Sequence, residues 1–374
     1  MQNIHWLGSG LSSIPGIRRL ASNNHNLTVW NRTLAKAQKS IDHVNNDNVS
    51  AQIFNINEIE EKIQQGDIIV SQLTASMHLD IAKICLKKKC HFVTTSYLAP
   101  DIKKLNEQAV AQNLMFINEV GLDPGIDHFF SHLLVQELKS MNLNNLSVSY
   151  KSYCGGIPAI PNDFKYKFSW SPVGVIKALN NPAKFIQNFE EKIVPQPYKE
   201  VKNYLINNEN FEAYPNRDSL PYIEEYLFSP EWKIKEFVRG TLRLNGWTLA
   251  WKEIFKILEK QDTNIEEQIQ KKSDELWNNY RYDKNEEDRV VLWVNLEAEQ
   301  QDKKVFSSTY YLDEKGSGEN TAMAKLVSIT LSAAVDLMLQ NKIQPGVQAA
   351  PSNKNIIEYF FKILSDYSIK IVHQ

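Results

Sequence analysis

The first 118 residues alternate short apolar runs with longer segments of helical period. The apolar runs are Asn3–Leu7, Leu27–Trp30, Gln52–Phe54, Asp67–Leu73, His91–Thr94 and Met115–Asn118. Each run is mainly apolar rather than strictly alternating, which is typical of strands covered on both faces. Because helical spans separate the runs, the pattern predicts an α/β domain with a doubly wound parallel sheet of the Rossmann type over residues 1–125.

The pattern changes in the segment 126–345. The stretches LSVSYKSYC, VLWVNLEAE and KVFSSTYYLD alternate apolar and polar positions, so they predict antiparallel strands of an α+β domain. We expect this domain to bind the substrate and its sheet to pair two subunits. Helical spans at Asn181–Asn207 and Ile254–Trp277 predict a small helical subdomain. The tail, from about residue 346 to 374, is expected to form a helix and a final strand or coil and to return to the nucleotide domain.

Composition narrows the class of protein. The 374 residues are 43% apolar with a formal net charge of −2, which suits two or three domains, each with its own core. The charge balance argues against nucleic acid or an anionic membrane as the main partner. The N-terminal stretch MQNIHWLGSG has no signal-peptide pattern and no 18 apolar residues run together, so we expect a soluble, cytoplasmic protein.

The three cysteines give no metal or redox motif. Cys85, Cys90 and Cys154 form no Cys-x-x-Cys pair, so the sequence predicts no metal site. Cys85 and Cys90 are expected to be buried small hydrophobes.

The segment LGSGLSSIPG joins the first predicted strand to a helix and carries a glycine pattern. Gly8 and Gly10 are followed by Ser13 where a third glycine is common, which is expected to set the helix slightly farther from the sheet. The missing side chain of Gly10 lets backbone N–H groups approach a pyrophosphate at the helix N-terminus. Pro15 falls in the first turn, where its missing N–H costs little. The segment predicts a dinucleotide site, with a tight turn that binds no nucleotide as the alternative.

The second strand ends in TVWNRT, without the acidic residue that usually binds the ribose 2′-hydroxyl of NAD. Arg32 and Thr33 offer a guanidinium and a hydroxyl instead, which suit a 2′-phosphate. The sequence therefore favours NADP, with NAD possible but less favoured. The alternative for Arg32 is a solvated surface charge.

The stretch GLDPGIDHFF follows the sixth predicted strand directly. Its turn leaves that strand at the ligand crevice, so Asp123 can face the reactive ring while Pro124 and Gly125 redirect the chain. Asp127 is interpreted as an N-cap or first-turn acid rather than a catalyst. At the preceding strand ends, QLTASMH is expected beside the pyrophosphate and VTTSYLAP beside the nicotinamide.

Longer motifs resemble one enzyme family. TTSYLAP, NEVGLDPGIDH, SYCGGIPA, YKFSWSPVGV, YPNRDSLPY, RGTLR and TAMAKLV are similar, in this order, to the saccharopine reductase family, the glutamate-forming saccharopine dehydrogenases. The resemblance runs from Gly8 to about Pro351. It implies NADP-dependent interconversion of saccharopine with L-glutamate and 2-aminoadipate 6-semialdehyde, by hydride transfer to or from an imine carbon, in lysine metabolism. The departures are Ser13, QLT in place of an Ile-Pro pair, and a polar stretch around Gln261–Asp288.

The resemblance also implies the site residues. The cofactor would contact Gly8, Ser9, Gly10, Leu11, Ser12, Arg32, Thr33, Asn55, Ile56, Leu73, Thr74, Thr95, Ser96, Leu122, Asp123, Pro124 and Ser169. Saccharopine would contact Ser96, Tyr97, Asp123, Cys154, Arg217, Thr241, Leu242 and Arg243. Saccharopine bears three carboxylates, and an arginine binds a carboxylate through two parallel hydrogen bonds. Asp123 is the candidate catalytic residue, with Tyr97 or Cys154 assisting, and which of the three moves the proton stays open.

Two other functions fit parts of the pattern. A related reductive-condensation enzyme, such as a carboxynorspermidine dehydrogenase, would use a diamine and leave Arg217 or Arg243 without a carboxylate. A non-catalytic NADP-binding regulator would have lost site residues, and none is lost. We expect a homodimer that acts on small molecules and binds neither membrane nor nucleic acid.

Overall fold

The computed structural model describes residues 2–23, 25–42, 44–169, 171–259 and 264–374. The chain divides into two compact units, the first formed by Met1–Phe129 and Glu319–Ile369 and the second by Phe130–Gly318 and Lys370–Gln374. The sequence analysis placed the first boundary at residue 125 and the return of the chain near residue 346. The two divisions differ mainly in the segment 319–345 and in the last five residues.

The first unit contains the predicted doubly wound parallel sheet. Its strands are β1 (Asn3–Leu7), β2 (Asn26–Asn31), β3 (Val49–Ile53), β4 (Ile68–Ser71), β5 (His91–Thr94), β6 (Met115–Ile117) and β15 (Gly346–Gln348). Their order is β15-β6-β5-β4-β1-β2-β3, and every paired neighbour is parallel. The strand order therefore reverses between β1 and β4, where such sheets bind their ligands. The sequence predicted six of these strands and missed β15.

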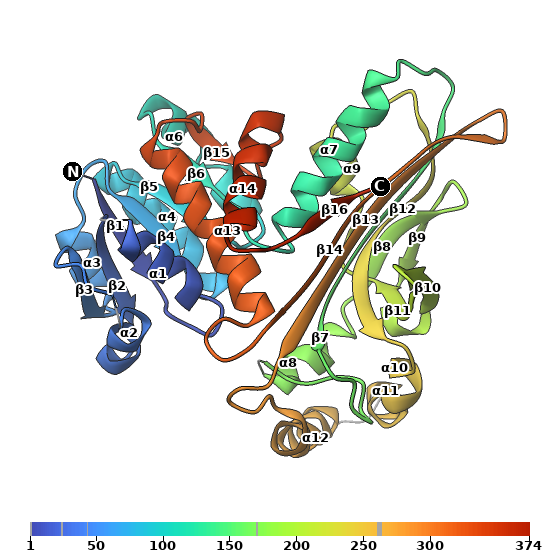
Figure 1. The fold of residues 1–374 in the computed structure, drawn as a ribbon, viewed down its shortest axis with the longest axis horizontal. Coiled ribbons are helices and arrows are strands. Elements are labelled where there is room, and N and C mark those ends of the chain that lie inside the picture. Colours follow the sequence, from blue (N-terminus) through green and yellow to red (C-terminus); the bar gives the residue numbers. More distant parts are fainter. Residues whose placement is uncertain (1, 24, 43, 170, 260–263) are drawn as a thin grey trace. The chain divides into compact units, whose positions relative to one another are not determined.

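Helices cover both faces of this sheet. They are α1 (Ile14–Ser22), α2 (Leu34–Ser40), α3 (Ile56–Lys62), α4 (Ala75–Lys88), α5 (Pro100–Lys103), α6 (Asn106–Ala111), α13 (Ala322–Leu339) and α14 (Lys354–Asp366), and α7 (Ile126–Ser140) crosses the unit boundary. Side chains of α3, α4 and α6 join Trp30, Phe92 and Phe116 of the sheet in one core cluster. Figure 1 shows α1, α13 and α14 side by side, and α1 and α13 are in direct contact.

Helices α1 and α13 approach each other closely at Gly16 of α1. A Cβ atom at this position would lie 2.1 Å from the backbone oxygen of Ser328 in α13. The Gly16 N–H also donates to Ser328 Oγ, at 2.8 Å. Only glycine therefore fits between these two helices without a shift of the backbone.

Helix α13 is central to the first unit. Among the described residues it is the one helix whose length and mean hydropathy, 1.6, match a membrane span, and 78% of it is buried inside the protein. A core helix surrounded by other elements has the same composition.

The second unit is built on a mixed sheet. Its strands are β7 (Ser147–Pro158), β8 (Ala183–Gln187), β9 (Glu190–Val194), β10 (Lys202–Ile206), β11 (Glu209–Pro215), β12 (Lys233–Leu244), β13 (Asp288–Gln300), β14 (Lys303–Gly316) and β16 (Ile371–His373). The main order is β10-β11-β12-β7-β13-β14-β16, with β8 and β9 attached at β12. β13 is antiparallel to both β7 and β14, as the alternating patterns predicted, whereas β12 and β7 are parallel.

The helical prediction for Asn181–Asn207 is wrong. This segment forms β8, β9, a short 3₁₀ helix (Pro197–Lys199) and β10. Two-residue turns connect β8 to β9 and β10 to β11, and both residues of each turn have positive φ, at Asn188–Phe189 and Asn207–Asn208. Asparagine tolerates this conformation and favours tight hairpins, so the turn residues outweighed the apparent helical period.

The helical prediction for Ile254–Trp277 is confirmed by α11 (Lys252–Glu259) and α12 (Ile265–Tyr280), and residues 260–263 lie outside the described residues. The unit also contains α8 (Pro172–Ala178), α9 (Pro221–Glu225) and α10 (Trp247–Ala250). Together α8, α10, α11 and α12 enclose an aromatic core cluster that includes Phe164, Trp247 and Trp251.

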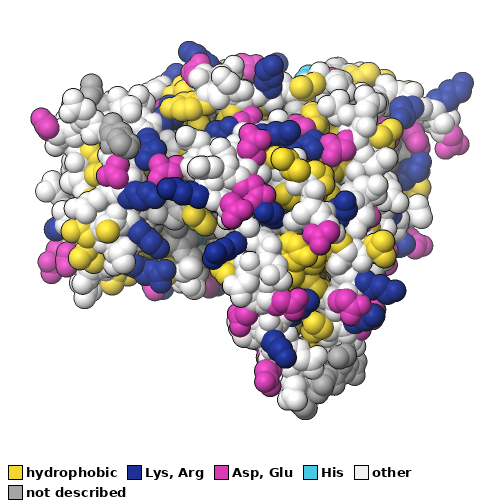
Figure 2. All heavy atoms as spheres, turned by 60° about the horizontal axis from the view of Figure 1, so that its bottom comes forward, with side chains coloured by type: hydrophobic (Ala, Val, Ile, Leu, Met, Phe, Trp, Pro, Cys, Tyr) yellow, Lys and Arg dark blue, Asp and Glu magenta, His cyan; other side chains and the backbone are white. Residues whose placement is uncertain are grey.

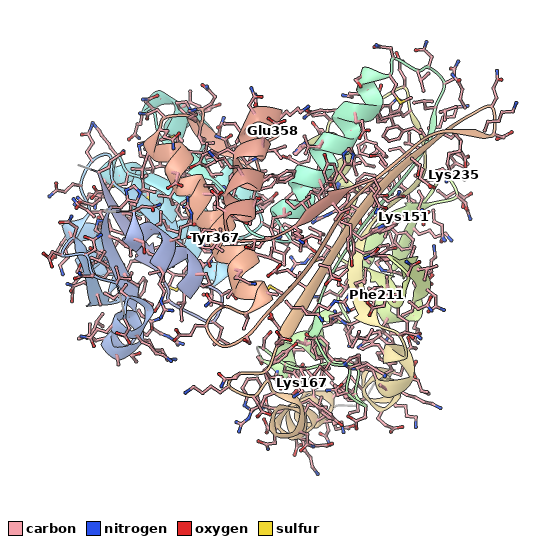
Figure 3. The ribbon with its side chains drawn as sticks, viewed as in Figure 1. Lys151, Lys167, Phe211, Lys235, Glu358 and Tyr367 are labelled. Carbon is pink, nitrogen blue, oxygen red and sulfur yellow. The ribbon has the colours of Figure 1, made fainter. Side chains whose placement is uncertain are left out.

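Charged side chains lie on the surface with both signs interleaved on the face that Figure 2 shows. Within the second sheet, Lys151 on β7 pairs with Glu236 on β12 at 2.9 Å, and Lys235 on β12 pairs with Glu299 on β13 at 2.8 Å. Figure 3 labels the two lysines. These exposed or half-buried pairs each contribute little to stability.

Candidate active site

The glycine loop after β1 lies at the switch point of the parallel sheet. Gly8 has φ of +96°, and a Cβ there would lie 2.8 Å from the Gln72 carbonyl oxygen at the end of β4. A Cβ at Gly10 would meet no atom within 4 Å, so the loop is open on that side. Gly8 is thus required for the turn, while Gly10 leaves the backbone accessible to a ligand.

Hydrogen bonds fix the shape of this loop. Asn31, the last residue of β2, donates from Nδ2 to Ser9 Oγ at 2.7 Å, and Ser9 Oγ donates to the Lys36 carbonyl at 3.2 Å. The Ser13 hydroxyl lies 3.1 Å from the Gly8 carbonyl and also contacts Gln72 Oε1. The serine that replaces the third glycine therefore ties the loop to the neighbouring strand ends. Pro15 occupies the first turn of α1, as predicted.

Arg32 and Thr33 follow β2 at the same edge of the sheet, and both are exposed. Within the described part of the chain, the Arg32 guanidinium has no ion pair. An exposed guanidinium without an ion pair, just after β2, fits the 2′-phosphate that distinguishes NADP from NAD. The residues of the first unit therefore fit the predicted cofactor: the glycine loop suits its pyrophosphate, and Arg32 suits its phosphate.

Four other predicted cofactor contacts have structural roles of their own. Asn55 caps α3, because its Oδ1 accepts from the N–H groups of residues 57 and 58. Ile56 and Leu73 are half-buried against the core of the first unit. Thr74 occupies the N-cap position of α4 without a side-chain cap, and its Oγ1 lies 3.3 Å from Ser76 Oγ.

A buried histidine contacts Ser96, one of the predicted site residues that follow β5. His78 of α4 is 2% exposed, and its Nε2 lies 2.8 Å from Ser96 Oγ. Burial lowers the pKa of His78 to about 4, so the ring is neutral near pH 7. The sequence analysis did not single out this residue. Its signal was a polar residue on the face of α4 that also carries the buried Ile81, Ala82 and Cys85.

The turn after β6 brings Asp123 and Tyr97 together. The Tyr97 hydroxyl donates to Asp123 Oδ1 at 3.0 Å. Within the turn, Gly121 N–H donates to the Pro124 carbonyl at 3.0 Å, and a Cβ at Gly125 would lie 2.2 Å from the Gly121 oxygen. The two glycines let the chain fold back on itself, which places the Asp123 carboxylate beside the phenol.

Buried acidic groups support this turn from within the first unit. Glu119, 4% exposed, accepts from the Leu98 N–H at 2.8 Å and lies 3.1 Å from His128 Nε2. Asp127 is fully buried in the first turn of α7 and accepts from the Gly125 N–H at 2.7 Å. Asp127 therefore holds the turn, in agreement with its interpretation as a first-turn acid, while Glu119 was missed by the sequence analysis.

Cys85 and Cys90 are buried free thiols, as predicted. Burial raises the pKa of Cys90 to about 12 and raises that of Cys85 well above its ordinary value. Both thiols are therefore protonated and unreactive.

Cys154 and the RGTLR segment lie on adjacent strands of the second unit. Cys154 on β7 is half-buried and directly opposite Thr241 on β12, so their side chains share one face of the sheet. Leu242 points to the opposite face, where its side chain is fully buried in a core cluster with Phe211. Any contact of Leu242 with a substrate would therefore come from its backbone.

Arg243 is buried inside an aromatic box. It is 7% exposed, and its guanidinium carbon lies 5.0 Å from the Tyr166 ring centre, 5.5 Å from Tyr214 and 5.7 Å from Trp247. Nη2 donates to the Tyr214 hydroxyl and Nη1 to the Leu242 carbonyl, both at 3.0 Å. Among the described residues no carboxylate pairs with Arg243 and its Nε has no partner. Arg243 is therefore a buried cation and not a surface charge.

The remaining predicted contacts of the second unit are exposed. Arg217 follows β11 with φ of +58°, and its carbonyl accepts from the Lys184 N–H at 2.8 Å. Asp218, its sequence neighbour, accepts from the Leu220 N–H at 3.0 Å. Ser169 belongs to the second unit, whereas the other predicted cofactor contacts belong to the first. The structure thus gathers the predicted residues into two groups, one in each unit.

Comparison with known protein families gives matches along nearly the whole chain. The model of the saccharopine dehydrogenase NADP binding domain matches residues 4–117, and that of the saccharopine dehydrogenase C-terminal domain matches residues 121–369. The NADP(+)-dependent, L-glutamate-forming saccharopine dehydrogenase of Pyricularia oryzae is 29% identical over 98% of this chain and 97% of its own length. The Schizosaccharomyces pombe enzyme of the same name is 29% identical over 99% of this chain and 98% of its own length.

Solved structures agree with these matches. The apo L-Glu-forming saccharopine dehydrogenase of Saccharomyces cerevisiae superimposes with a TM-score of 0.84 at 26% identity, over 100% of this chain and 99% of its own. The homospermidine synthase of Legionella pneumophila superimposes with a TM-score of 0.66 at 11% identity, over 100% of this chain and 91% of its own. It shares the fold.

Proposed function

Because the chain belongs to the saccharopine dehydrogenase family, we propose that it interconverts saccharopine with L-glutamate and 2-aminoadipate 6-semialdehyde, using NADP, in lysine metabolism. The fold, the glycine loop and Arg32 support the cofactor. The observation that carries the substrate is Arg243, a buried cation whose carboxylate partner is absent from the described protein.

Burial of an unpaired cation is unfavourable unless a ligand completes its interactions. Arg243 has aromatic faces around its guanidinium and an Nε with no protein partner, so a carboxylate of the substrate would complete the site. Saccharopine carries three carboxylates. A diamine-derived substrate with fewer carboxylates fits this site less well, which argues against the related reductive-condensation enzymes.

In the oxidative direction, the secondary amine of saccharopine loses a hydride and a proton to give an imine, and addition of water releases glutamate and the semialdehyde. The chemistry that bound NADP supplies is the exchange of hydride. The protein would stabilise the positive charge of the protonated imine through the Asp123 carboxylate, which Tyr97 orients at 3.0 Å. Asp123, Tyr97 and Cys154 remain the candidates for moving the proton.

The proposal is tested by mixing the purified protein with saccharopine and NADP⁺ and following the absorbance of the reduced cofactor. Arg243→Lys keeps the charge but loses the planar fork, so we expect the KM for saccharopine to rise at least tenfold. Calorimetry should show NADP⁺ affinity within about twofold of the parent. Lys235→Arg, at an exposed ion pair of the same sheet, is the control and should change neither constant.

Two results would contradict the proposal. The first is a parent protein that binds NADP⁺ but does not oxidise saccharopine. The second is an Arg243→Lys variant that binds saccharopine as tightly as the parent. The homodimer and the cytoplasmic location are also part of the proposal, and light scattering of the purified protein tests the dimer.

A further inference from the structure

His78 connects the ends of two parallel strands in the first unit. Its Nδ1 lies 3.0 Å from Ser71 Oγ at the end of β4, and its Nε2 lies 2.8 Å from Ser96 Oγ just after β5. Thr94 Oγ1 is farther from Nε2, at 3.4 Å. His78, Ser71 and Thr94 are buried, whereas Ser96 is half-buried and borders the ligand side of the sheet.

The hydrogen bonds of Ser71 decide which ring nitrogen carries the proton. A neutral histidine has one N–H donor and one bare nitrogen acceptor. Among the described residues, His78 is the side-chain partner of the fully buried Ser71 hydroxyl. If Nδ1 donated to Ser71, the Ser71 hydroxyl hydrogen would be left buried without an acceptor, which is unfavourable. Ser71 therefore donates to Nδ1, and the ring proton is on Nε2.

This assignment leaves the hydroxyl proton of Ser96 available. Nε2–H donates to Ser96 Oγ, since this contact is short whereas the one to Thr94 exceeds the usual hydrogen-bond length. The Ser96 backbone is held as well, because its N–H donates to Thr94 Oγ1 at 3.3 Å and its carbonyl accepts from the Glu119 N–H at 3.1 Å. Ser96 is thus fixed as a donor toward whatever binds at the end of β5.

We propose that His78 is a positioning residue that holds the Ser96 hydroxyl so that it donates its proton to a carboxylate of the bound substrate. The substrate part of this inference rests on the proposed function. The orientation part rests on the contacts of His78 alone.

Kinetics of matched variants test the positioning role. His78→Gln places an amide nitrogen near the Nε2 position, whereas His78→Asn reaches only the Nδ1 position. We expect His78→Asn and Ser96→Ala each to raise the KM for saccharopine about tenfold, and the double variant to be no worse than Ser96→Ala. The KM of His78→Gln for saccharopine should stay within about threefold of that of the parent. In the two His78 single variants, calorimetry should show NADP⁺ affinity within about twofold of that of the parent.

A role in packing alone would give a different result. Both replacements remove the ring, whose centre lies 6.2 Å from that of Phe92, so a packing role would impair them equally. Equal losses in the Gln and Asn variants, or additive effects of His78→Asn and Ser96→Ala, would overturn the proposal.

Nitrogen NMR of ¹⁵N-histidine-labelled protein tests the orientation without turnover. The His78 signal is identified among eight histidines by its loss in His78→Gln. A protonated Nε2 and a bare Nδ1 near pH 7 support the inference, and the reverse tautomer or a charged ring would overturn it. If the parent protein failed to oxidise saccharopine, the proposed function would fail while this measurement still decided the orientation of Ser96.

Discussion

Asp123 combines a negative charge with a position fixed by its neighbours, because Tyr97 donates to Oδ1 and the glycine turn holds the backbone. Asp123→Asn keeps the shape and removes the charge. We expect NADP⁺ affinity to be retained and kcat to fall about 30–1000-fold, equivalent to roughly 2–4 kcal/mol of transition-state stabilisation. Steady-state rates with saccharopine and calorimetry with NADP⁺ give the two quantities.

Asp101→Asn is the matched control for this change, since Asp101 is exposed and pairs with Lys104 on the surface. It should leave kcat unchanged. Normal turnover in Asp123→Asn would mean that Asp123 only shapes the turn.

His78 also makes stability depend on pH. Its pKa is about 4 in the folded protein and about 6.5 when unfolded, so above pH 6.5 the ring is neutral in both states. As the pH falls, the unfolded chain binds the proton first, and the folded state loses about 2 kcal/mol by pH 5 relative to pH 7. Urea unfolding of the parent and of His78→Gln at pH 7 and pH 5 measures this loss.

Between pH 7 and pH 5, His78→Gln should lose about 2 kcal/mol less of its free energy of unfolding than the parent loses, because glutamine binds no proton. His25 and His91, whose pKa values burial also lowers, are shared by both proteins and cancel in the comparison. If the free energies of unfolding of the two proteins changed equally with pH, folding would not lower the pKa of His78.

Residues whose role depends on local sequence could be predicted, and those whose role depends on distant contacts could not. Gly8 lies in a βα turn and Arg32 just after a strand end, and the order of apolar runs locates both positions. His78 gains its role from Ser71 and Ser96 on two other strands. The box around Arg243 combines Tyr166, Tyr214 and Trp247, which no sequence spacing relates.

At the scale of elements, the contact between α1 and α13 depends on Gly16. In an exposed helix, Gly→Ala stabilises by up to about 1 kcal/mol through helix propensity. Here the new Cβ would lie 2.1 Å from the Ser328 backbone oxygen, which cannot move aside as a flexible side chain can. We expect Gly16→Ala to lower the free energy of unfolding by about 2 kcal/mol or more in urea.

Gly10→Ala is the control for stability, because its Cβ would meet no atom within 4 Å. It should change the urea midpoint little. A Gly16→Ala variant as stable as the parent would show that the two helices can separate without loss.

Periodicity identified the elements with the strongest patterns. The central parallel strands β1, β4, β5 and β6 are buried on both faces and stood out as apolar runs, whereas the edge strand β3 has no fully buried residue. The segment 181–207 contains mixed charges whose spacing resembled a helix, while the decisive signal was two pairs of turn residues centred on asparagine. The missed strand β15 has three residues, which is too few for any period to be visible.

At the scale of the whole molecule, fold class and family could be inferred from the sequence, because both depend on motifs in chain order. The division into units depends on contacts between segments far apart in the chain. Helix α13 was placed with the second domain, yet it is counted with the first unit through its packing on α1 and α14.

The interrupted first unit has a consequence for how the protein is made. Roughly 190 residues separate Phe129 from Glu319. A ribosome adds about 5–20 residues per second, so α13 is synthesised about 10–40 s after the N-terminal part of the first unit. During this interval the side of α1 around Gly16 has no partner helix and its apolar neighbours face water. The part of the protein that is synthesised first is therefore not completed first, and a nascent chain stalled before Glu319 would present this uncovered face to chaperones and to other nascent chains.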